Sequence, residues 1–481
     1  MFVRAAMGSV ALLLAACASD APFQRPALPV PDRWDSTERQ PFAQQAVHVH
    51  WRSFFADPRL QALIELALTN NRDMRIAVAR VEEARAQYGI VRADRLPTIG
   101  ALGAGSFSRT PADLSGVGGV VDGSRYDLSL TSVSFELDFW GRVAGLTDAA
   151  KSTYFASAEA QRAFQLSLVA DLASSYFTLL QLDQVANLAK STLDLRSQSL
   201  TLVDKGRELG GAYDFDVQLA QGMVASARAT LDSVQYQRQV AVNRLNYLVG
   251  TTPTALPPGR PMDAQGLDVQ LDAGLPGEVL LMRPDVMAAE QRLHAAHANI
   301  DAARAAFLPK VLLTAGVGVA SQGLLGLFTG SAWTFQPSIA VPIFDGGRLS
   351  SALSVAEVRK NIAVAEYEKT IQLAFREVAD LLAARESLVR QVVAAAASEG
   401  TQKRRLEITQ ARYQGGLSSF MEVLDSEREW VASQQLTAQV RRAQLESAAQ
   451  LYKALGGGIT AEESARARSN EQKVSANGVQ K

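Results

Sequence analysis

The sequence is poor in the residues that most often carry chemistry. It has one cysteine, Cys17, and four histidines among 481 residues. A lone thiol excludes an intramolecular disulfide and any metal site made of cysteines. Lys and Arg number 48, and Asp and Glu 49, so the excess of positive charge typical of nucleic-acid-binding proteins is missing. No run of about 20 apolar residues occurs, and we therefore expect no helix that spans a bilayer.

Motifs of known enzyme classes are missing too. The sequence has no HExxH, Walker or GxSxG motif. Its glycine-rich stretch at 116–119 lies between two expected strands rather than before a helix, so it does not predict a phosphate-binding loop. His294 and His297, with Glu290 one turn earlier, leave a metal site open, but a solvated helix face is the favoured interpretation. We expect no enzyme activity, no cofactor and no metal.

The N-terminus predicts an exported, lipid-anchored protein. Arg4 precedes an apolar run that is too short to span a membrane, so residues 1–16 are typical of a signal peptide. The run ends in Leu-Ala-Ala-Cys17, which resembles a bacterial lipobox with Cys17 as the lipidation site. An ordinary signal peptide followed by a chance cysteine is the alternative. Ala18, not Asp, follows the cysteine, which by resemblance to lipoprotein sorting signals favours the outer membrane.

Composition and landmarks divide the rest of the chain. Residues 17–55 are rich in proline, which fixes the backbone and removes donors, so they predict an extended arm. Two repeats follow at 56–255 and 278–458, joined by a linker at 256–277. The polar tail at 459–481 predicts disorder.

The two repeats carry the same landmarks in the same order. Pro97 recurs 212 positions later as Pro309, and Gly141-Arg142 recurs 206 positions later as Gly347-Arg348. A period of roughly 210 residues is far too long for a solenoid. The pattern therefore indicates that one structural half was duplicated.

Each repeat contains a pair of expected strands, at 98–108 and 126–139 and again at 310–320 and 333–343. Apolar residues alternate with small or polar ones, which predicts strands that are apolar on one face and wet on the other. That pattern fits a β-sandwich face or the wall of a transmembrane barrel. Four strands cannot close a membrane barrel, so several chains would have to supply one. Pro337 and Pro342 predict a bend where the fourth strand leaves the sheet.

A long helical hairpin follows each strand pair, at 142–250 and 348–456. The first helix of each would be roughly 95 Å long, with only Gly145 or Gly400 as a breaker. Small residues recur on more than one face, which predicts helices that touch neighbours on both sides.

At this point the sequence resembles the TolC- and OprM-like outer-membrane factors, close to the NodT-type efflux lipoproteins, over residues 17–458. The order and spacing of several motifs carry the resemblance: the lipobox, the segment 51–60, Arg283-Pro284-Asp285, Phe307-Leu308-Pro309, 341–348, 413–417 and Val423-Leu424-Asp425.

The resemblance implies an α+β membrane protein with an internal repeat. Three identical chains would form a homotrimer with a 12-stranded transmembrane β-barrel and a 12-helix α-barrel in the periplasm. Such a protein is a passive exit duct of a tripartite efflux system for drugs or other small molecules. Its expected partners are a periplasmic adaptor protein, an inner-membrane pump of the RND type and outer-membrane lipid, with no nucleic acid. The alternatives are the exit duct of a type I protein secretion system and a periplasmic coiled-coil lipoprotein without a pore.

The resemblance also implies a periplasmic gate at the hairpin tips. Glu422 and Asp425, one turn apart, would form acidic rings at the constriction, with Asp216 and Tyr413 linking neighbouring hairpins. The alternative is that these acids only solvate a helix start. A family arginine is replaced by Ser418 and its neighbour, which predicts a weaker closed state. The tips would receive the adaptor's helical hairpin at six residues: Gly210, Gly211, Gly415, Gly416, Leu417 and Ser418.

Overall fold

The fold is that of a computed structural model that describes residues 23–34, 44–45, 49–211, 213–253, 255–267, 271–272, 274 and 276–458. The expected signal peptide, the lipidation site Cys17 and the tail at 459–481 lie outside these residues. Two compact units are present, and each draws on both sequence repeats. The strand unit holds residues 23–27, Arg80–Ala158 and Ala288–Glu368, and the hairpin unit holds Leu28–Ala79, Glu159–Met287 and 369–458.

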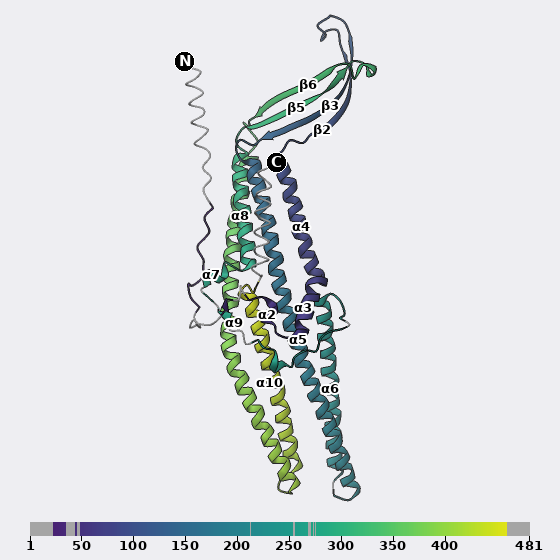
Figure 1. The fold of residues 1–481 in the computed structure, drawn as a ribbon, viewed down its shortest axis with the longest axis vertical. Coiled ribbons are helices and arrows are strands. Elements are labelled where there is room, and N and C mark those ends of the chain that lie inside the picture. The colour runs from purple at the N-terminus through teal and green to yellow at the C-terminus, as the bar shows by residue number, and fades with distance from the viewer. Residues whose placement is uncertain are drawn as a thin grey trace. The chain divides into compact units, whose positions relative to one another are not determined.

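The strand unit contains one antiparallel sheet of four strands in the order β2-β3-β5-β6 (Figure 1). Its strands are β2 (Gly100–Thr110), β3 (Val121–Leu137), β5 (Lys310–Ser321), which is followed by the short η3 (Leu324–Gly326), and β6 (Ser331–Ala340). β3 starts five residues before the expected position because Val121 pairs with Thr110 of β2. Within the described residues, β2 and β6 each pair on one side only.

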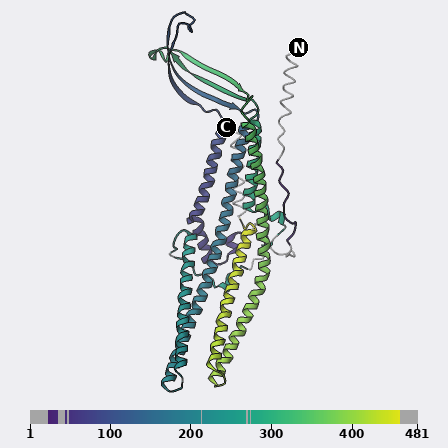
Figure 2. The same cartoon turned by 180° about the vertical axis from the view of Figure 1, so that it is seen from behind.

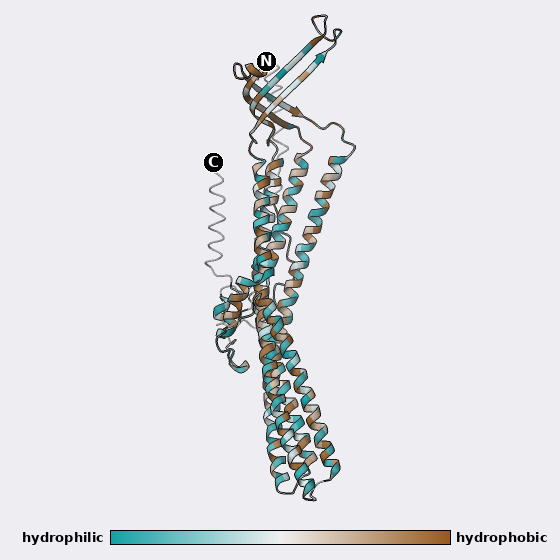
Figure 3. Ribbon diagram, turned by 90° about the vertical axis from the view of Figure 1, so that its right-hand side faces the viewer, coloured by the Kyte–Doolittle hydropathy of each residue, from teal (hydrophilic) through white to brown (hydrophobic). Residues whose placement is uncertain are grey.

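Strand register gives this sheet one apolar and one polar face. Tyr126, Leu128 and Leu130 of β3 point to one side, and the pairings of Leu128 with Val319 and of Leu130 with Val317 extend that side across β5. Trp333 of β6 joins them through its pairing with Val317. Figure 3 shows hydrophobic and hydrophilic residues interleaved along the strands. The opposite face carries small and polar residues, among them Arg125, Asp127, Ser129, Gly316 and Gly318.

Two local features adjust the expected alternation. The register of β3 shifts between Ser132 and Phe135, and Ser134 adopts a positive φ of 53° while its N–H donates to Thr314 Oγ1 at 3.0 Å. Pro342 follows the end of β6, as expected for a bend. Pro337 instead lies inside β6, opposite Leu313, so the expectation of a bend is wrong for this residue. Within the described sheet β6 is an edge strand, where proline is more readily accommodated than in a central strand.

Long helices adjoin the sheet in sequence. They are α4 (Arg72–Ala93), α5 (Arg142–Glu208), α8 (Pro284–Ala305) and α9 (Arg348–Gln414). Gly145 does not interrupt α5: a Cβ there would lie 3.1 Å from the carbonyl oxygen of Ala298, so the glycine allows α5 and α8 to approach closely. Gly400 faces open space inside α9, which continues through it. One 18-residue stretch of α5 is long and apolar enough to cross a membrane, and 56% of it is buried, as in many core helices.

The hairpin unit is built from two helical hairpins, α5 with α6 (Asp214–Val249) and α9 with α10 (Phe420–Ala454). Their helices lie in the order α6, α5, α10, α9 (Figures 1 and 2). Arg238 of α6 pairs with Asp183 of α5, and Gln450 of α10 donates to Ser174 of α5 at 3.3 Å. α5 and α10 therefore form the seam between the two hairpins.

Short elements pack against the hairpins in the same unit: α2 (Trp51–Phe54), α3 (Pro58–Asn70), η2 (Met262–Ala264), α7 (Pro276–Leu280), and β1 (Gln44–Gln45) parallel to β4 (Leu271–Asp272). Asp57 joins them. Its buried carboxylate accepts hydrogen bonds from Tyr176 Oη at 2.8 Å and from Gln265 Nε2 at 3.0 Å. Burial, together with this bond, raises the pKa of Tyr176.

Candidate functional site

Both hairpin tips are closed by the same backbone turn. Gly210 and Gly416 adopt φ values of 76° and 71°, which favour glycine. In the first tip, Gly211 N donates to the Gly206 carbonyl at 2.7 Å and Gly210 N to the Arg207 carbonyl at 2.9 Å. The second tip repeats the pair, with Leu417 N on Arg412 and Gly416 N on Tyr413 at 2.8 and 3.0 Å. These bonds satisfy the last carbonyls of each helix, as in a Schellman motif.

The helices that follow the turns start with the expected acids. Ser418 Oγ donates to Glu422 Oε2 at 2.6 Å, and Ser419 N donates to Glu422 Oε1 at 3.4 Å. These bonds lower the pKa of Glu422, with that from Ser418 the larger cause. Asp216 takes the matching position in the first hairpin, where its carboxylate accepts a hydrogen bond from Tyr213 N at 3.0 Å. Glu422 and Asp216 therefore cap helix starts, and for Glu422 this matches the alternative to a gate role.

Asp425 has a different environment. It accepts from Arg405 of α9 at 2.9 Å and from Arg428 one turn along α10 at 2.8 Å, and its side chain is 44% exposed. Asp425 and Glu422 line one open groove of about 1100 Å³ between α9 and α10. Asp216 lies on the other hairpin. The structure thus brings together two of the four expected gate residues.

Tyr413 lies just before the second turn. Its ring is 45% exposed and its centroid lies 5.6 Å from that of Phe420. It therefore packs within its own hairpin.

The site expected from the sequence did not include the arginines of this groove. Arg404, Arg405 and Arg412 line the same groove as the acids, so the groove carries both signs of charge. The sequence holds a signal for one of them, because Arg405 and Asp425 lie equally far from Gly415 on the two sides of the turn. Folding the helices back at that glycine places the two side by side.

The expectation that His294 lies on a solvated helix face is wrong. The ring of Phe23 lies 3.7 Å from that of His294, and burial lowers the pKa of the imidazole. Arg25 of the same arm pairs with Glu290 at 2.7 Å. Among the described residues, no cluster of three His, Cys, Asp or Glu side chains is arranged to hold a metal ion.

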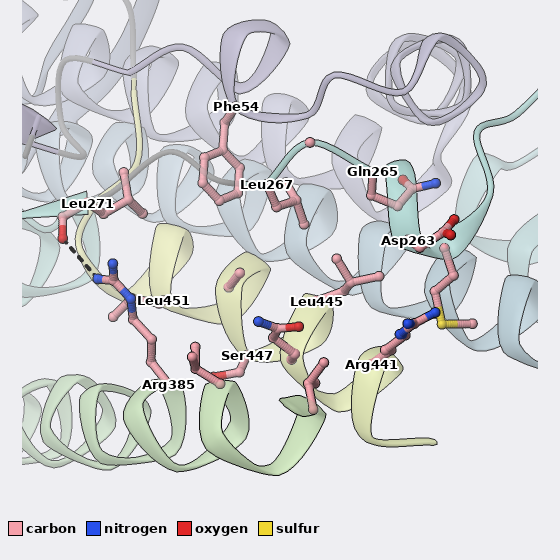
Figure 4. Close-up of a pocket in the computed structure, with 16 residues that line it drawn as sticks. Phe54, Asp263, Gln265, Leu267, Leu271, Arg385, Arg441, Leu445, Ser447 and Leu451 are labelled. Carbon is pink, nitrogen blue, oxygen red and sulfur yellow. Dashed lines mark hydrogen bonds between the residues drawn. The ribbon is translucent and has the colours of Figure 1, made fainter. Parts of the chain in front are cut away.

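A further hollow of about 500 Å³ lies in the hairpin unit, where residues 262–267 and Leu271 face α9 and α10 (Figure 4). Phe54, Leu445 and Leu451 give it apolar walls. Arg385, at one end, donates to the Leu271 carbonyl at 3.3 Å. Sequence reasoning did not find this hollow because residues 262–271 match no motif.

Comparison with known proteins identifies the architecture. The model of the outer membrane efflux protein family matches residues 63–251 and 275–457. Outer membrane protein OprJ of Pseudomonas aeruginosa is 40% identical over 452 residues, covering 93% of this chain and 94% of that protein. The toluene efflux pump outer membrane protein TtgI of Pseudomonas putida is 41% identical over 458 residues, covering 93% and 96%.

A solved structure agrees along almost the whole chain. The open state of the MtrE outer membrane channel of Neisseria gonorrhoeae superposes with a TM-score of 0.84 and 37% identity, covering 92% of this chain and 99% of that one. The family match covers nearly all of both sequence repeats. The chain belongs to the outer membrane efflux protein family and is an outer-membrane channel for efflux.

Proposed function

We propose that three copies of this chain assemble into the passive exit duct of a tripartite efflux system. Their twelve strands close one barrel through the outer membrane, and their twelve long helices close a tunnel in the periplasm. Cys17 carries the lipid anchor. A periplasmic adaptor docks at the hairpin tips around Gly210 and Gly416, and an inner-membrane pump of the RND type supplies the energy.

The sheet carries this proposal. Its side chains divide into an apolar and a polar face, and its apolar side chains are exposed: Leu130 by 56%, Val317 by 63% and Trp333 by 79%. β2 and β6, as the edge strands of the described sheet, present unpaired backbone groups that a bilayer does not tolerate. Joining β6 of one copy to β2 of the next satisfies both edges, with the apolar face toward lipid and the polar face toward water.

Two helices support a closed ring. On α4, five half-buried residues follow a heptad spacing: Ala77, Val81, Ala84, Tyr88 and Val91. A second heptad series lies on the opposite face and is exposed: Ile76, Ala79, Glu83, Ala86, Ile90 and Ala93. The helix α9 repeats the arrangement, with an exposed series opposite Ala356, Ala363 and Tyr367 that contains Val355, Val358, Ile362 and Ala365. Helices with seams on two faces suit a cylinder in which every helix has two neighbours.

The gate is proposed for the second hairpin. Three copies would place six carboxylates, from Glu422 and Asp425, around one axis, a charge that attracts cations. Arg405 holds Asp425 to its own helix pair, and Ser418 holds Glu422. Asp216 and Tyr413 would link neighbouring hairpins in the closed state.

Small, partly apolar molecules are the proposed cargo. Relatives that cover 93% of this chain are named for toluene efflux, solvent efflux and antibiotic efflux. A wide, wet tunnel selects loosely by size and charge, so we expect cargo choice to rest with the pump.

The test is conductance of the purified full-length protein in planar bilayers, with its particle mass. We expect the mass of three chains and a small cation-selective current. Replacing Glu422 and Asp425 together by Ala should raise the current about tenfold, because each of the three copies loses the ion pairs of Asp425 with Arg405 and Arg428. The exposed acid Glu386 offers the control Glu386→Ala, which should leave the current unchanged. A protein that never conducts, even with both acids removed, would be a rod rather than a duct.

A further inference from the structure

A partly open cavity lies in the seam between the hairpins, next to the groove of Glu422 and Asp425 along α10. It measures about 330 Å³ and is lined by α5 on one side and α10 on the other. The first hairpin contributes mostly small polar and aliphatic residues: Gln184, Val185, Asn187, Leu188, Ser191, Thr192 and Leu195. The second contributes Glu427, Trp430, Val431, Gln434 and Ala438. A movement of one hairpin against the other must open or close this cavity, because its walls belong to different hairpins.

Three side chains of α10 leave polar atoms without a partner there. They are Glu427 Oε1, Trp430 Nε1 and Gln434 Oε1, all buried and without a hydrogen bond. Their spacing of three and four residues places them on one face of the helix. The Glu427 residue is only 6% exposed. Buried polar atoms are normally paired, so three in one cavity mark a seam that is not optimised for permanent closure.

Charge around Glu427 is sparse. On α5, Arg196 is the one charged group in the described residues that acts on its carboxyl, and the two form no ion pair within 4.0 Å. Arg196 instead donates from Nη1 to the Met223 carbonyl of α6 at 3.3 Å, and its Nε has no partner. The charged neighbours on α10 are engaged elsewhere: Asp425 with Arg405 of α9, and Arg428 with Asp425 and Glu429.

Burial therefore acts on Glu427 more strongly than attraction does. It raises the pKa of this carboxyl, and Arg196 offsets part of the rise. A raised pKa in the closed seam means that the closed seam binds a proton more tightly than an open, wet one. Closure is then favoured at low pH and loses that contribution as the pH rises through the pKa of the closed state.

We propose that Glu427 is a further gating residue: protonated, it lets the α5–α10 seam close, and ionised, it loosens the seam between the two hairpins. This rests on the proposed duct function and adds an acid-sensitive closure to it. The group acts through helix packing, since it lies inside the wall and does not line the groove of Glu422 and Asp425. The corresponding residue of the first repeat is Gln221, which cannot titrate. Only one hairpin per chain therefore senses acid in this way.

The experiment measures the seam and the pore separately in the full-length protein. Amide exchange at 184–196 and 427–438, corrected for intrinsic pH effects, should be about three- to tenfold faster at pH 7.5 than at pH 5.0. Bilayer current should rise in the same sense. In Glu427→Gln, which keeps the shape and removes the titration, both should stay at the acid value. The control Glu429→Gln, on the exposed side of the same helix, should keep the wild-type response.

The outcomes separate the two proposals. Equal pH responses of exchange in wild type and Glu427→Gln would overturn the role of Glu427, whatever the current does. Absence of current at every pH, with exchange behaving as expected, would overturn the duct and leave the seam intact. Loss of the pH response in Glu429→Gln as well would assign the effect to helix charge in general and also overturn the proposal.

Discussion

The two hairpin tips have the same backbone conformation but different charged residues. Gly210 and Gly416 close the same turn, and Asp216 and Glu422 cap the same helix start. Beyond that, the ionic residues of the second tip face uncharged residues in the first. Asp425, Arg405, Glu427 and Arg428 stand where the first repeat has Leu219, Ser199, Gln221 and Gly222. Duplication therefore kept the turn but not these four charges, and the first tip has different ion pairs, from Arg207 to Asp204 and Asp214.

The opposite ends of the hairpins make the same point. Asn71 Nδ2 donates to the Leu248 carbonyl at 2.8 Å, and Arg283 Nη1 donates to the Ala454 carbonyl at 2.9 Å. Leu248 and Ala454 are equivalent in the two repeats. Arg283 does more than Asn71, because it also binds Asp285 at 2.7 Å and Glu377 at 2.9 Å. One helix end is thus held by a neutral amide and the other by a buried ionic cluster.

The largest expected effect tests this difference. Arg283→Met leaves two carboxylates and a carbonyl without their donor and should destabilise the protein by about 3 kcal/mol. Asn71→Ala removes only neutral hydrogen bonds and should cost about 1–2 kcal/mol. Thermal unfolding of the detergent-solubilised protein should rank the two in this order.

Arg441→Met is the matched control, since Arg441 has no ion pair among the described residues, and its midpoint should stay near wild type. If Asn71→Ala lowered the midpoint as much as Arg283→Met, the ionic cluster would add nothing to the helix-end bond. The two repeats would then be equivalent at this end.

Sequence reasoning reached the long helices because their signals are local. Glycine at the turns and heptad spacing mark α5 and α9 without reference to the rest of the chain. The shift at Ser134 was out of reach because it depends on Thr314, which is distant in sequence and adjacent only in the sheet. Gly145 was misread for the same reason: its role is set by the backbone of α8.

Sequence reasoning named only part of the charged groove at the second tip. Acids after a glycine turn are visible in the sequence, and so Glu422 and Asp425 were named. Their partners are not visible, because a sequence does not state which face of α9 meets α10. The charge balance of the groove and the burial of Glu427 follow from that packing alone.

A smaller effect should be the same in both hairpins. Gly210→Ala and Gly416→Ala each force a side chain into a positive φ and should each cost about 1 kcal/mol. Limited proteolysis at the tips should show equal gains in cleavage. Gly222→Ala and Gly400→Ala, inside exposed helix stretches with open space around them, are controls that should not increase cleavage. Unequal effects at the two tips would mean that the turns are not energetically equivalent.

The smallest expected effect concerns Asp425, which has Leu219 as its counterpart in the first hairpin. Asp425→Asn weakens the bonds from Arg405 and Arg428, and since these side chains are 49% and 70% exposed, each bond is worth roughly 0.5 kcal/mol. Amide exchange at 418–428 should rise about two- to fivefold, while exchange at 213–222 stays unchanged. Leu219→Asn, the equivalent change in the first hairpin, breaks no ion pair and should alter neither segment. If it loosened its own tip as much as Asp425→Asn does, the asymmetry would lie in helix packing, and the charges of the second hairpin would not be what distinguishes it.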